Sequence, residues 1–201
     1  QLPETVTVVE RARPDLQALQ ESGRKFLPYE YTETDVPPML SFGEGQRFHV
    51  TGLAHDESGF PTNNGKEVER LLRRLHRKID RYSDRIIQVD SRPREGARVG
   101  VVCYGSSARS ARMAVRMLEE EGTPASYLAL LTLWPFPQKA VQELATEVSH
   151  IVVPELNLGQ IAHEVEWASR GRCEVHSIQR VDGEPIRPAQ IADRMRELCR
   201  K

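Results

Sequence analysis

The stretch R-V-G-V-V-C-Y-G-S-S, residues 98–107, decides the fold of this chain. Its apolar run is short and continuous, which is typical of a strand that is buried on both faces. Glycine and serine follow at once, and the next residues predict a helix that runs to about Glu121. A buried strand that leads directly into a helix opens a βαβ unit, so this stretch predicts an α/β domain.

The same alternation continues to the end of the chain. The sequence predicts further strands at 125–133, 150–154 and 173–179, with helices at 137–148, 158–169 and 188–199. Strands that alternate with helices of this length form parallel sheets with helices on both faces. We therefore expect one α/β domain with a mostly parallel sheet over residues 97–201.

Residues 1–65 have a different character, because prolines and glycines interrupt them throughout. Proline fixes φ and lacks a backbone donor, so neither a long helix nor a central strand is expected here. Short extended pieces are predicted at 6–10 and 47–51. Such a segment buries little apolar surface alone, and we expect it to lie on a larger body.

A long amphipathic helix is predicted over 66–87, because apolar residues recur there every three or four positions. Asn63 and Asn64 offer a cap before it. The opposite face is rich in arginine and lysine, which leaves two interpretations. It can grip a phosphate or RNA, or it can face solvent or a subunit; interspersed acidic residues favour the second. Residues 91–96 are predicted to be a linker.

Composition excludes several classes of protein. The chain has 201 residues, with 28 basic and 29 acidic side chains and a net charge of -1. This balance argues against a strongly basic nucleic-acid binder. No apolar stretch approaches the roughly 18 residues of a membrane span. We expect a soluble, cytoplasmic chain with neither nucleic acid nor membrane as its partner.

The three cysteines, Cys103, Cys173 and Cys199, are far apart and form no C-x-x-C pair. An odd number without metal-ligand spacing argues against a zinc ribbon, an iron–sulfur site or a disulfide framework. We therefore expect no metal in this chain, and thiols that stay reduced.

Two turns follow the first two predicted strands. Gly105, Ser106 and Ser107 form a turn that opens a helix, so they can be a tight turn with a serine cap or can hold a phosphate or carboxylate. They lack the spacing of a dinucleotide or P-loop motif. Trp134 and Phe136 lie between prolines, where they can anchor a partner or fasten the following helix to the sheet.

The third turn, V-P-E-L-N-L-G-Q, places Glu155 just beyond a strand end. Open α/β sheets bind ligands at the carboxyl ends of their strands, so Glu155 can be a general base. No histidine or second carboxylate is close in sequence, which favours a structural or interface role. Asn157 is predicted to cap the helix that begins near Gln160.

His55, Asp56 and Glu57 lie in a glycine-rich loop, where a histidine with two carboxylates can hold a metal. Adjacent residues rarely point at one ion, so a hydrogen-bonded surface or interface loop is the preferred interpretation. The remaining histidines form no i, i+4 pair. No nucleophile, base and orienting residue come together, and the residues alone predict a binding or docking domain.

Six motifs in order resemble a known family. They are F-L-P-Y-E-Y-T-E-T-D-V-P-P (26–38), H-V-T-G-L-A-H-D-E-S-G (49–59), V-V-C-Y-G-S-S-A-R-S-A (101–111), L-L-T-L-W-P-F-P (130–137), E-L-N-L-G-Q (155–160) and D-G-E-P-I-R-P (182–188). Together they resemble the C-terminal third of the alpha subunit of 2-oxoacid:ferredoxin oxidoreductases. The loop T-G-L-A-H-D-E-S-G points to the 2-oxoglutarate type.

The resemblance implies a function for the full complex. Such enzymes oxidatively decarboxylate a 2-oxoacid with thiamine diphosphate and magnesium, pass electrons through a [4Fe-4S] cluster to ferredoxin, and form an acyl-CoA. It implies that residues 97–201 are a transketolase C-terminal-like domain. Residues 1–65 would then be the irregular tail of a pyrimidine-binding domain, joined by a helix and linker over 66–96.

The resemblance also implies what this chain lacks. The family's substrate-binding motif and its thiamine-activating glutamate lie upstream of this stretch, and its diphosphate–magnesium motif and cluster cysteines lie in the beta subunit. No catalytic, cofactor-binding or metal-ligating residue is therefore assigned here, and the chain alone is expected to be inactive. The expected partners are the beta subunit and the rest of the alpha subunit, with ferredoxin and coenzyme A meeting the whole complex.

The turns at Gly105–Ser107, at Trp134 and Phe136, and at Glu155, Asn157 and Gln160 become interface candidates under this resemblance. The loop with His55 and Asp56 is expected to approach a neighbouring subunit's cofactor cleft. The alternative is a freestanding α/β module that binds an anionic ligand at Gly105–Ser107 or docks on a partner protein.

Overall fold

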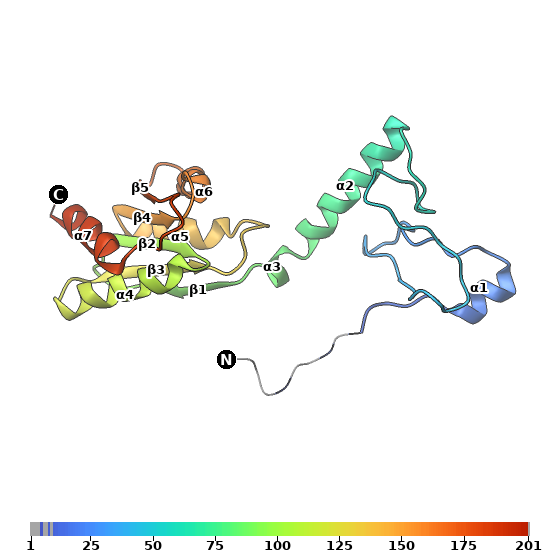
Figure 1. The fold of residues 1–201 in the computed structure, drawn as a ribbon, viewed down its shortest axis with the longest axis horizontal. Coiled ribbons are helices and arrows are strands. Elements are labelled where there is room, and N and C mark those ends of the chain that lie inside the picture. The colour runs from blue at the N-terminus through green and yellow to red at the C-terminus, as the bar shows by residue number, and fades with distance from the viewer. Residues whose placement is uncertain (1–4, 6–7, 9, 201) are drawn as a thin grey trace. The chain divides into compact units, whose positions relative to one another are not determined.

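The computed structural model of the chain describes residues 5, 8 and 10–200. The chain separates into two compact units, Gln1–Tyr82 and Ser83–Lys201 (Figure 1). The predicted extended piece at 6–10 lies mostly outside the described residues. None of the helices in the described part of the chain is long and apolar enough to cross a membrane.

The described part of the N-terminal unit has two helices, α1 (Leu16–Ser22) and α2 (Gly65–Arg81). The short helix α1 was not predicted. It begins because the side chain of Asp15 accepts hydrogen bonds from two backbone N–H groups, and it ends at Gly23, whose φ is 63°. The predicted extended piece at 47–51 is not a strand, and the segment between the helices has only an isolated bridge from His55 to Pro61.

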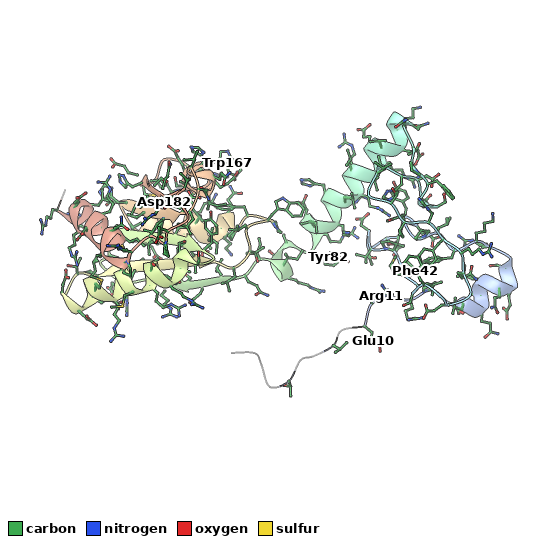
Figure 2. The ribbon with its side chains drawn as sticks, viewed as in Figure 1. Glu10, Arg11, Phe42, Tyr82, Trp167 and Asp182 are labelled. Carbon is green, nitrogen blue, oxygen red and sulfur yellow. The ribbon has the colours of Figure 1, made fainter. Side chains whose placement is uncertain are left out.

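Helix α2 begins as the sequence predicts. Oδ1 of Asn64 accepts hydrogen bonds from the backbone N–H of Lys66 at 3.0 Å and of Glu67 at 3.3 Å, so the cap is confirmed. The predicted end at 87 is wrong. The helix stops at Arg81, Tyr82 has a non-helical ψ of 12°, and a separate short helix α3 (Ser83–Ile86) follows. Tyr82 is labelled in Figure 2.

The basic face of α2 holds the chain's own preceding segment. Arg74 is buried and donates to the carbonyl oxygen of Tyr29 at 2.6 Å. Arg77 donates to both carboxylate oxygens of the buried Asp35, at 2.9 and 2.5 Å. The guanidinium of Arg70 stacks 3.6 Å from the ring centroid of Tyr31. These contacts occupy three of the basic residues on the face that suggests phosphate or RNA binding.

The C-terminal unit is built on one five-stranded sheet. Its strands are β1 (Val89–Arg92), β2 (Val99–Tyr104), β3 (Ala125–Leu130), β4 (His150–Glu155) and β5 (Glu174–Gln179), in the order β1-β3-β2-β4-β5. The last four are parallel, and β1 pairs antiparallel with β3 at one edge. The predicted mostly parallel sheet is confirmed.

Strand β1 is another element that the sequence did not predict. Ser91 and Arg92, which were expected in a linker, pair with Leu128 and Tyr127 of β3. The strand has four residues, none of them fully buried, and its last residue, Arg92, directly precedes Pro93. A short polar edge strand before a proline carries no hydrophobic alternation, which is the signal that identifies strands in sequence.

Four helices cover the sheet: α4 (Ser107–Glu120), α5 (Gln138–Glu147), α6 (Gln160–Ser169) and α7 (Pro188–Cys199). Helices α4 and α7 share one hydrophobic core with the sheet, and α5 and α6 share the other. Figure 1 shows the two pairs on opposite faces of the strands. The predicted α/β fold with helices on both faces is therefore confirmed, with strand and helix ends shifted by a few residues.

Candidate functional site: the carboxyl edge of the sheet

The turns that follow β2, β3 and β4 leave the sheet at the same edge, because these three strands are parallel neighbours. We call this region, residues 104–107, 131–137 and 155–160, the carboxyl edge. It contains every predicted site residue of the C-terminal unit. His55 and Asp56 lie in the N-terminal unit and are described separately.

Glu155 is the central polar residue of the carboxyl edge. Its side chain is fully buried at the end of β4. Oε1 accepts from the backbone N–H of Ala162 at 2.9 Å, and Oε2 accepts from that of Ile161 at 2.8 Å and from the Tyr104 hydroxyl at 3.2 Å. Both oxygens are thus committed to the first turn of α6 and to Tyr104. This is the geometry of a helix-capping carboxylate, and it gives a solvent-facing general base no support.

Tyr104 and Asn157 complete this network. Nδ2 of Asn157 donates to the Tyr104 hydroxyl oxygen at 2.6 Å, while its Oδ1 accepts from the backbone N–H of Gly159 at 2.8 Å and of Gln160 at 3.1 Å. The N-cap residue of α6 is Gly159 rather than the predicted Asn157, although Oδ1 of Asn157 does accept from the first helical N–H, that of Gln160. Burial, followed by the negative charge of Glu155, raises the pKa of Tyr104 above its ordinary value. Tyr104 therefore stays a neutral hydrogen-bond donor.

The backbone conformation at position 159 explains why this residue is a glycine. Its φ is +93°, and a Cβ there would lie 2.6 Å from Nε2 of Gln179. The left-handed backbone is what favours glycine here, because the flexible end of the Gln179 side chain can shift away from an added Cβ. Gln160 follows as the exposed first residue of α6.

The turn after β2 differs from its predicted form. Gly105 has a φ of +53°, as expected of a tight turn. Ser106 takes the N-cap position of α4, as predicted, but its side chain makes no capping hydrogen bond. The hydroxyl of Ser107 instead donates to the carbonyl oxygen of Tyr104 at 2.8 Å. Binding of a phosphate or carboxylate at this turn remains a prediction.

The turn after β3 separates its two aromatic residues. Phe136 is half-buried and packs against the core beneath α5, so it fastens that helix to the sheet. Trp134, which precedes a cis peptide bond to Pro135, is 64% exposed. Two leucines of the carboxyl edge are equally exposed, Leu131 at 65% and Leu158 at 69%. Large apolar groups thus project from two of the three turns.

A second feature of this unit is a basic hollow of about 690 Å³ beside α4 and the edge formed by β1 and β3. Five arginines line it: Arg92, Arg94, Arg109, Arg112 and Arg116. Arg92 and Arg112 share Asp90, and Arg94 pairs with Glu119. Among the described residues, the side chain of Arg109 has no hydrogen-bond or ion-pair partner. The hollow is therefore basic but partly neutralised.

The loop with His55 and Asp56 does not assemble a metal site among the described residues. Nδ1 of His55 lies 2.7 Å from the carbonyl oxygen of Leu53, Asp56 accepts from Ser58, and Glu57 accepts from the backbone N–H of Tyr31. The three side chains thus turn to different partners. Nε2 of His55 is buried without a hydrogen-bond partner, which leaves one acceptor nitrogen unsatisfied in this unit.

The three cysteines are free. Burial raises the pKa of Cys103 to about 12 and raises the pKa values of Cys173 and Cys199 above their ordinary value. A [4Fe-4S] cluster takes four thiolates. Three protonated, separated thiols do not fit such a cluster.

The sequence did not identify Tyr104 or the arginines of the basic hollow as site residues. Tyr104 meets Glu155 from 51 positions away, and the arginines come from β1, α4 and the loop between β1 and β2. Such groupings depend on strand order, which local spacing does not encode. The only available signal was the arginine spacing at 109, 112 and 116, which places those side chains on one face of α4.

Comparison with known proteins defines the class. Residues 97–191 match the family model of the pyruvate:ferredoxin oxidoreductase core domain II. These residues cover the sheet from β2 to β5 and reach the first turn of α7. The C-terminal unit thus resembles this core domain over most of its length.

The chain is also similar to curated proteins over almost its whole length. The chain is 38% identical over 200 residues to the 2-oxoglutarate synthase subunit KorA of Methanothermobacter thermautotrophicus, covering 99% of this chain and 52% of that protein. It is 35% identical over 190 residues to the KorA subunit of Methanocaldococcus jannaschii, covering 94% of this chain and 49% of the relative. The chain spans about half of the length of the curated relatives that it matches.

A solved structure agrees with these relatives. The 2-oxoglutarate:ferredoxin oxidoreductase from Magnetococcus marinus, with 2-oxoglutarate, coenzyme A and succinyl-CoA bound, superposes with a TM-score of 0.78 at 27% identity, over 96% of this chain and 33% of that one. The family resemblance is confirmed: this chain is homologous to part of the KorA or alpha subunit of 2-oxoacid:ferredoxin oxidoreductases.

Proposed function

We propose that this chain is an assembly portion of the alpha subunit of a 2-oxoglutarate:ferredoxin oxidoreductase and is inactive alone. In this proposal the full complex converts 2-oxoglutarate to succinyl-CoA and reduces ferredoxin. Residues 1–65 are the tail of a pyrimidine-binding domain, residues 66–96 connect it, and residues 97–201 dock the subunits. The beta subunit and the rest of the alpha subunit are the partners.

The carboxyl edge is the observation that carries this proposal. Its polar residues, Tyr104, Glu155 and Asn157, are bonded to one another and to the first turn of α6. Its apolar residues, Trp134 and Leu158, project outward. The polar side chains thus have their hydrogen-bond partners within the chain, and apolar side chains are exposed above them. This arrangement suits a docking surface better than a reaction centre, since aromatic anchors dominate binding energy at interfaces.

The proposal places the family's cofactors outside this chain. The cysteines do not fit a [4Fe-4S] cluster, as argued above, and the Glu155 carboxylate is committed to backbone N–H groups. Thiamine diphosphate, magnesium and the cluster would therefore be held elsewhere in the complex. A cytoplasmic location accords with three cysteines that form no disulfide.

The first experiment isolates the native polypeptide that carries this sequence and measures its intact mass together with bound iron and thiamine diphosphate. A much longer polypeptide, or this chain bound to an iron-containing partner with thiamine diphosphate, is the expected result. A lone chain of 22.8 kDa with neither component would overturn the proposal.

A second experiment tests the carboxyl edge in the whole complex. Trp134→Ser and Leu158→Ser should weaken assembly with the partner subunits by about tenfold or more, since buried aromatic anchors are worth 2 kcal/mol or more. Trp167→Ser is the matched control, because Trp167 is 67% exposed on α6, away from the turns (Figure 2). Equal assembly of all three variants would show that the carboxyl edge is not the docking surface.

The basic hollow favours a second candidate function, binding of an anionic ligand. Phosphate or pyrophosphate that binds only the folded chain would raise its melting temperature. Arg109→Glu should reduce this rise, whereas Lys139→Glu, on α5 at the opposite face of the sheet, should leave it intact. An equal rise in both variants, or none in the unsubstituted chain, would exclude the hollow as an anion site.

A further inference from the structure

A cluster of three metal-binding side chains lies on the face of the sheet that α7 covers. His150 is the first residue of β4, and Glu174 and His176 lie in β5. The register pairs His150 with Glu174 and Val152 with His176. Because side chains alternate along a strand, these positions share one face, and Val152 packs in the core beneath α4 and α7. This cluster is separate from the carboxyl edge, since His150 and Glu174 begin their strands.

The distances in this cluster match those of a tetrahedral metal site. Nδ1 of His150 lies 3.2 Å from Nε2 of His176 and 3.4 Å from Oε2 of Glu174, and the last two atoms are 3.6 Å apart. Metal–ligand bonds of about 2.0–2.2 Å at tetrahedral angles place neighbouring ligand atoms about 3.3–3.6 Å apart. One ion therefore fits between the three atoms without any change of backbone.

The chemistry of the three groups indicates which ion they suit. Two imidazole nitrogens and one carboxylate oxygen form the ligand set of open zinc sites, in which a water molecule takes the fourth position. The imidazoles are mostly buried, with 11% and 17% of their side chains exposed, while the Glu174 side chain is 72% exposed. The two histidines are thus held in place by the surrounding structure, while the glutamate is open to solvent.

We propose that His150, Glu174 and His176 form a binding site for Zn²⁺ or a similar divalent transition metal. This inference does not depend on the proposed function, because it uses only the C-terminal unit. The bound ion joins β4 to the edge strand β5 and stabilises the folded chain by an amount that grows with metal concentration.

Arg194 of α7 competes with the metal. Its Nη2 lies 3.3 Å from Nδ1 of His176, and its Nη1 donates to Glu197 at 2.9 Å. A guanidinium only donates, so it favours the tautomer in which Nδ1 accepts and Nε2 carries the proton. Metal binding needs the lone pair of Nε2, so the ion requires Arg194 to turn away towards Glu197. Arg194→Gln, whose amide oxygen can accept from Nδ1–H, should therefore bind the metal more tightly.

The test uses the full chain without a polyhistidine tag. Zn²⁺ binding is measured by calorimetry, and Co²⁺ reports geometry through its visible absorption. The expected result is one ion per chain with a tetrahedral Co²⁺ spectrum that lacks thiolate charge-transfer bands. His176→Asn and the exposed Glu174→Gln should weaken binding by more than about tenfold. Arg194→Gln should strengthen it.

His76→Asn is the matched control, because His76 is an exposed histidine 2.8 Å from a carboxylate oxygen of Asp80 in α2. It should bind Zn²⁺ as the unsubstituted chain does. Glu174→Gln keeps the test sound if a histidine variant fails to fold, which circular dichroism detects. Absence of a site in the unsubstituted chain would overturn the proposal. Binding that survives both Glu174→Gln and His176→Asn, or a cobalt–thiolate spectrum, would also overturn it.

Discussion

The hydroxyl of Tyr104 donates to the buried carboxylate of Glu155 at 3.2 Å, and this bond joins the ends of two adjacent parallel strands, β2 and β4. The same carboxylate accepts from two backbone N–H groups of α6. One side chain thus connects two strands and a helix at the carboxyl edge.

Glu155→Ala should lower the free energy of unfolding by about 1–3 kcal/mol, because it leaves the N–H groups of Ile161 and Ala162 without their acceptor. Tyr104→Phe should cost about 1 kcal/mol, since it removes the hydroxyl but leaves the helix cap. Urea unfolding of the C-terminal unit measures both. A Glu155→Ala variant as stable as the unsubstituted chain would contradict the capping role.

Alkaline pH should destabilise the C-terminal unit through Cys103 and Tyr127. Burial raises both pKa values to about 12 in the folded chain. Since the folded pKa values exceed the unfolded ones, this stability is complete below about pH 9 and is lost progressively between about pH 9 and 12. Urea unfolding across this range measures the loss, and Cys103→Ala should make it smaller near its lower end. Rapid labelling of native Cys103 by a thiol reagent at neutral pH would contradict the shift.

Asp35→Asn should loosen the segment 26–38 from α2. Hydrogen bonds from Arg77, despite the opposing effect of burial, lower the pKa of Asp35. Its stabilising effect is therefore present above the ordinary aspartate pKa and is lost as pH falls through the lowered value. Limited proteolysis at neutral pH should cut the variant faster within this segment. Glu33→Gln, at an exposed position, should behave as the unsubstituted chain.

Gly59→Ala should disrupt the loop that carries His55. The glycine has a φ of +87°, and an added Cβ would lie 2.0 Å from the carbonyl oxygen of His49. We expect a cost of more than about 1 kcal/mol and faster hydrogen exchange at the Thr62 amide, which bonds Ala54. Gly52→Ala is the control, since nothing lies within 4 Å of its added Cβ. Equal exchange in both variants would contradict this steric argument.

His55 and Asp56 are predicted to approach a cofactor cleft of a neighbouring subunit, and this rests on the proposed function. Nε2 of His55 is a buried acceptor without a hydrogen-bond partner among the described residues, so a group from outside the chain reaches it only if the loop moves. His55→Ala with Asp56→Ala should lower turnover of the full complex while its subunits still assemble. Unchanged turnover would remove this loop from the active complex.

The sequence predicts features that depend on neighbours along the chain. The buried runs of β2, β3 and β4 and the cap at Asn64 are local patterns, and each was recovered. Strand β1 was not, because Ser91 and Arg92 are polar and carry no hydrophobic alternation, and their pairing with β3 joins residues far apart in the sequence.

The candidate sites also combine features that a local pattern predicts with features that depend on long-range pairing. Glu155 was recognised by its place after a strand, but its partners decided its role, and Tyr104 is one of them. The pairing of His150 with Glu174 and His176 depends on the register of β4 against β5. Register between strands that a helix separates is set by the packing of the whole sheet, which a local pattern does not specify.

Strand β1 also decides where this polypeptide can be divided. It covers the free edge of β3, a strand whose six residues are all buried, and it precedes the family-model match that starts at residue 97. A fragment cut at 97 would expose that edge and offer its unpaired amides and carbonyls to other chains, which leads to aggregation. Any gene split or domain exchange that leaves a soluble C-terminal half must therefore fall ahead of Val89.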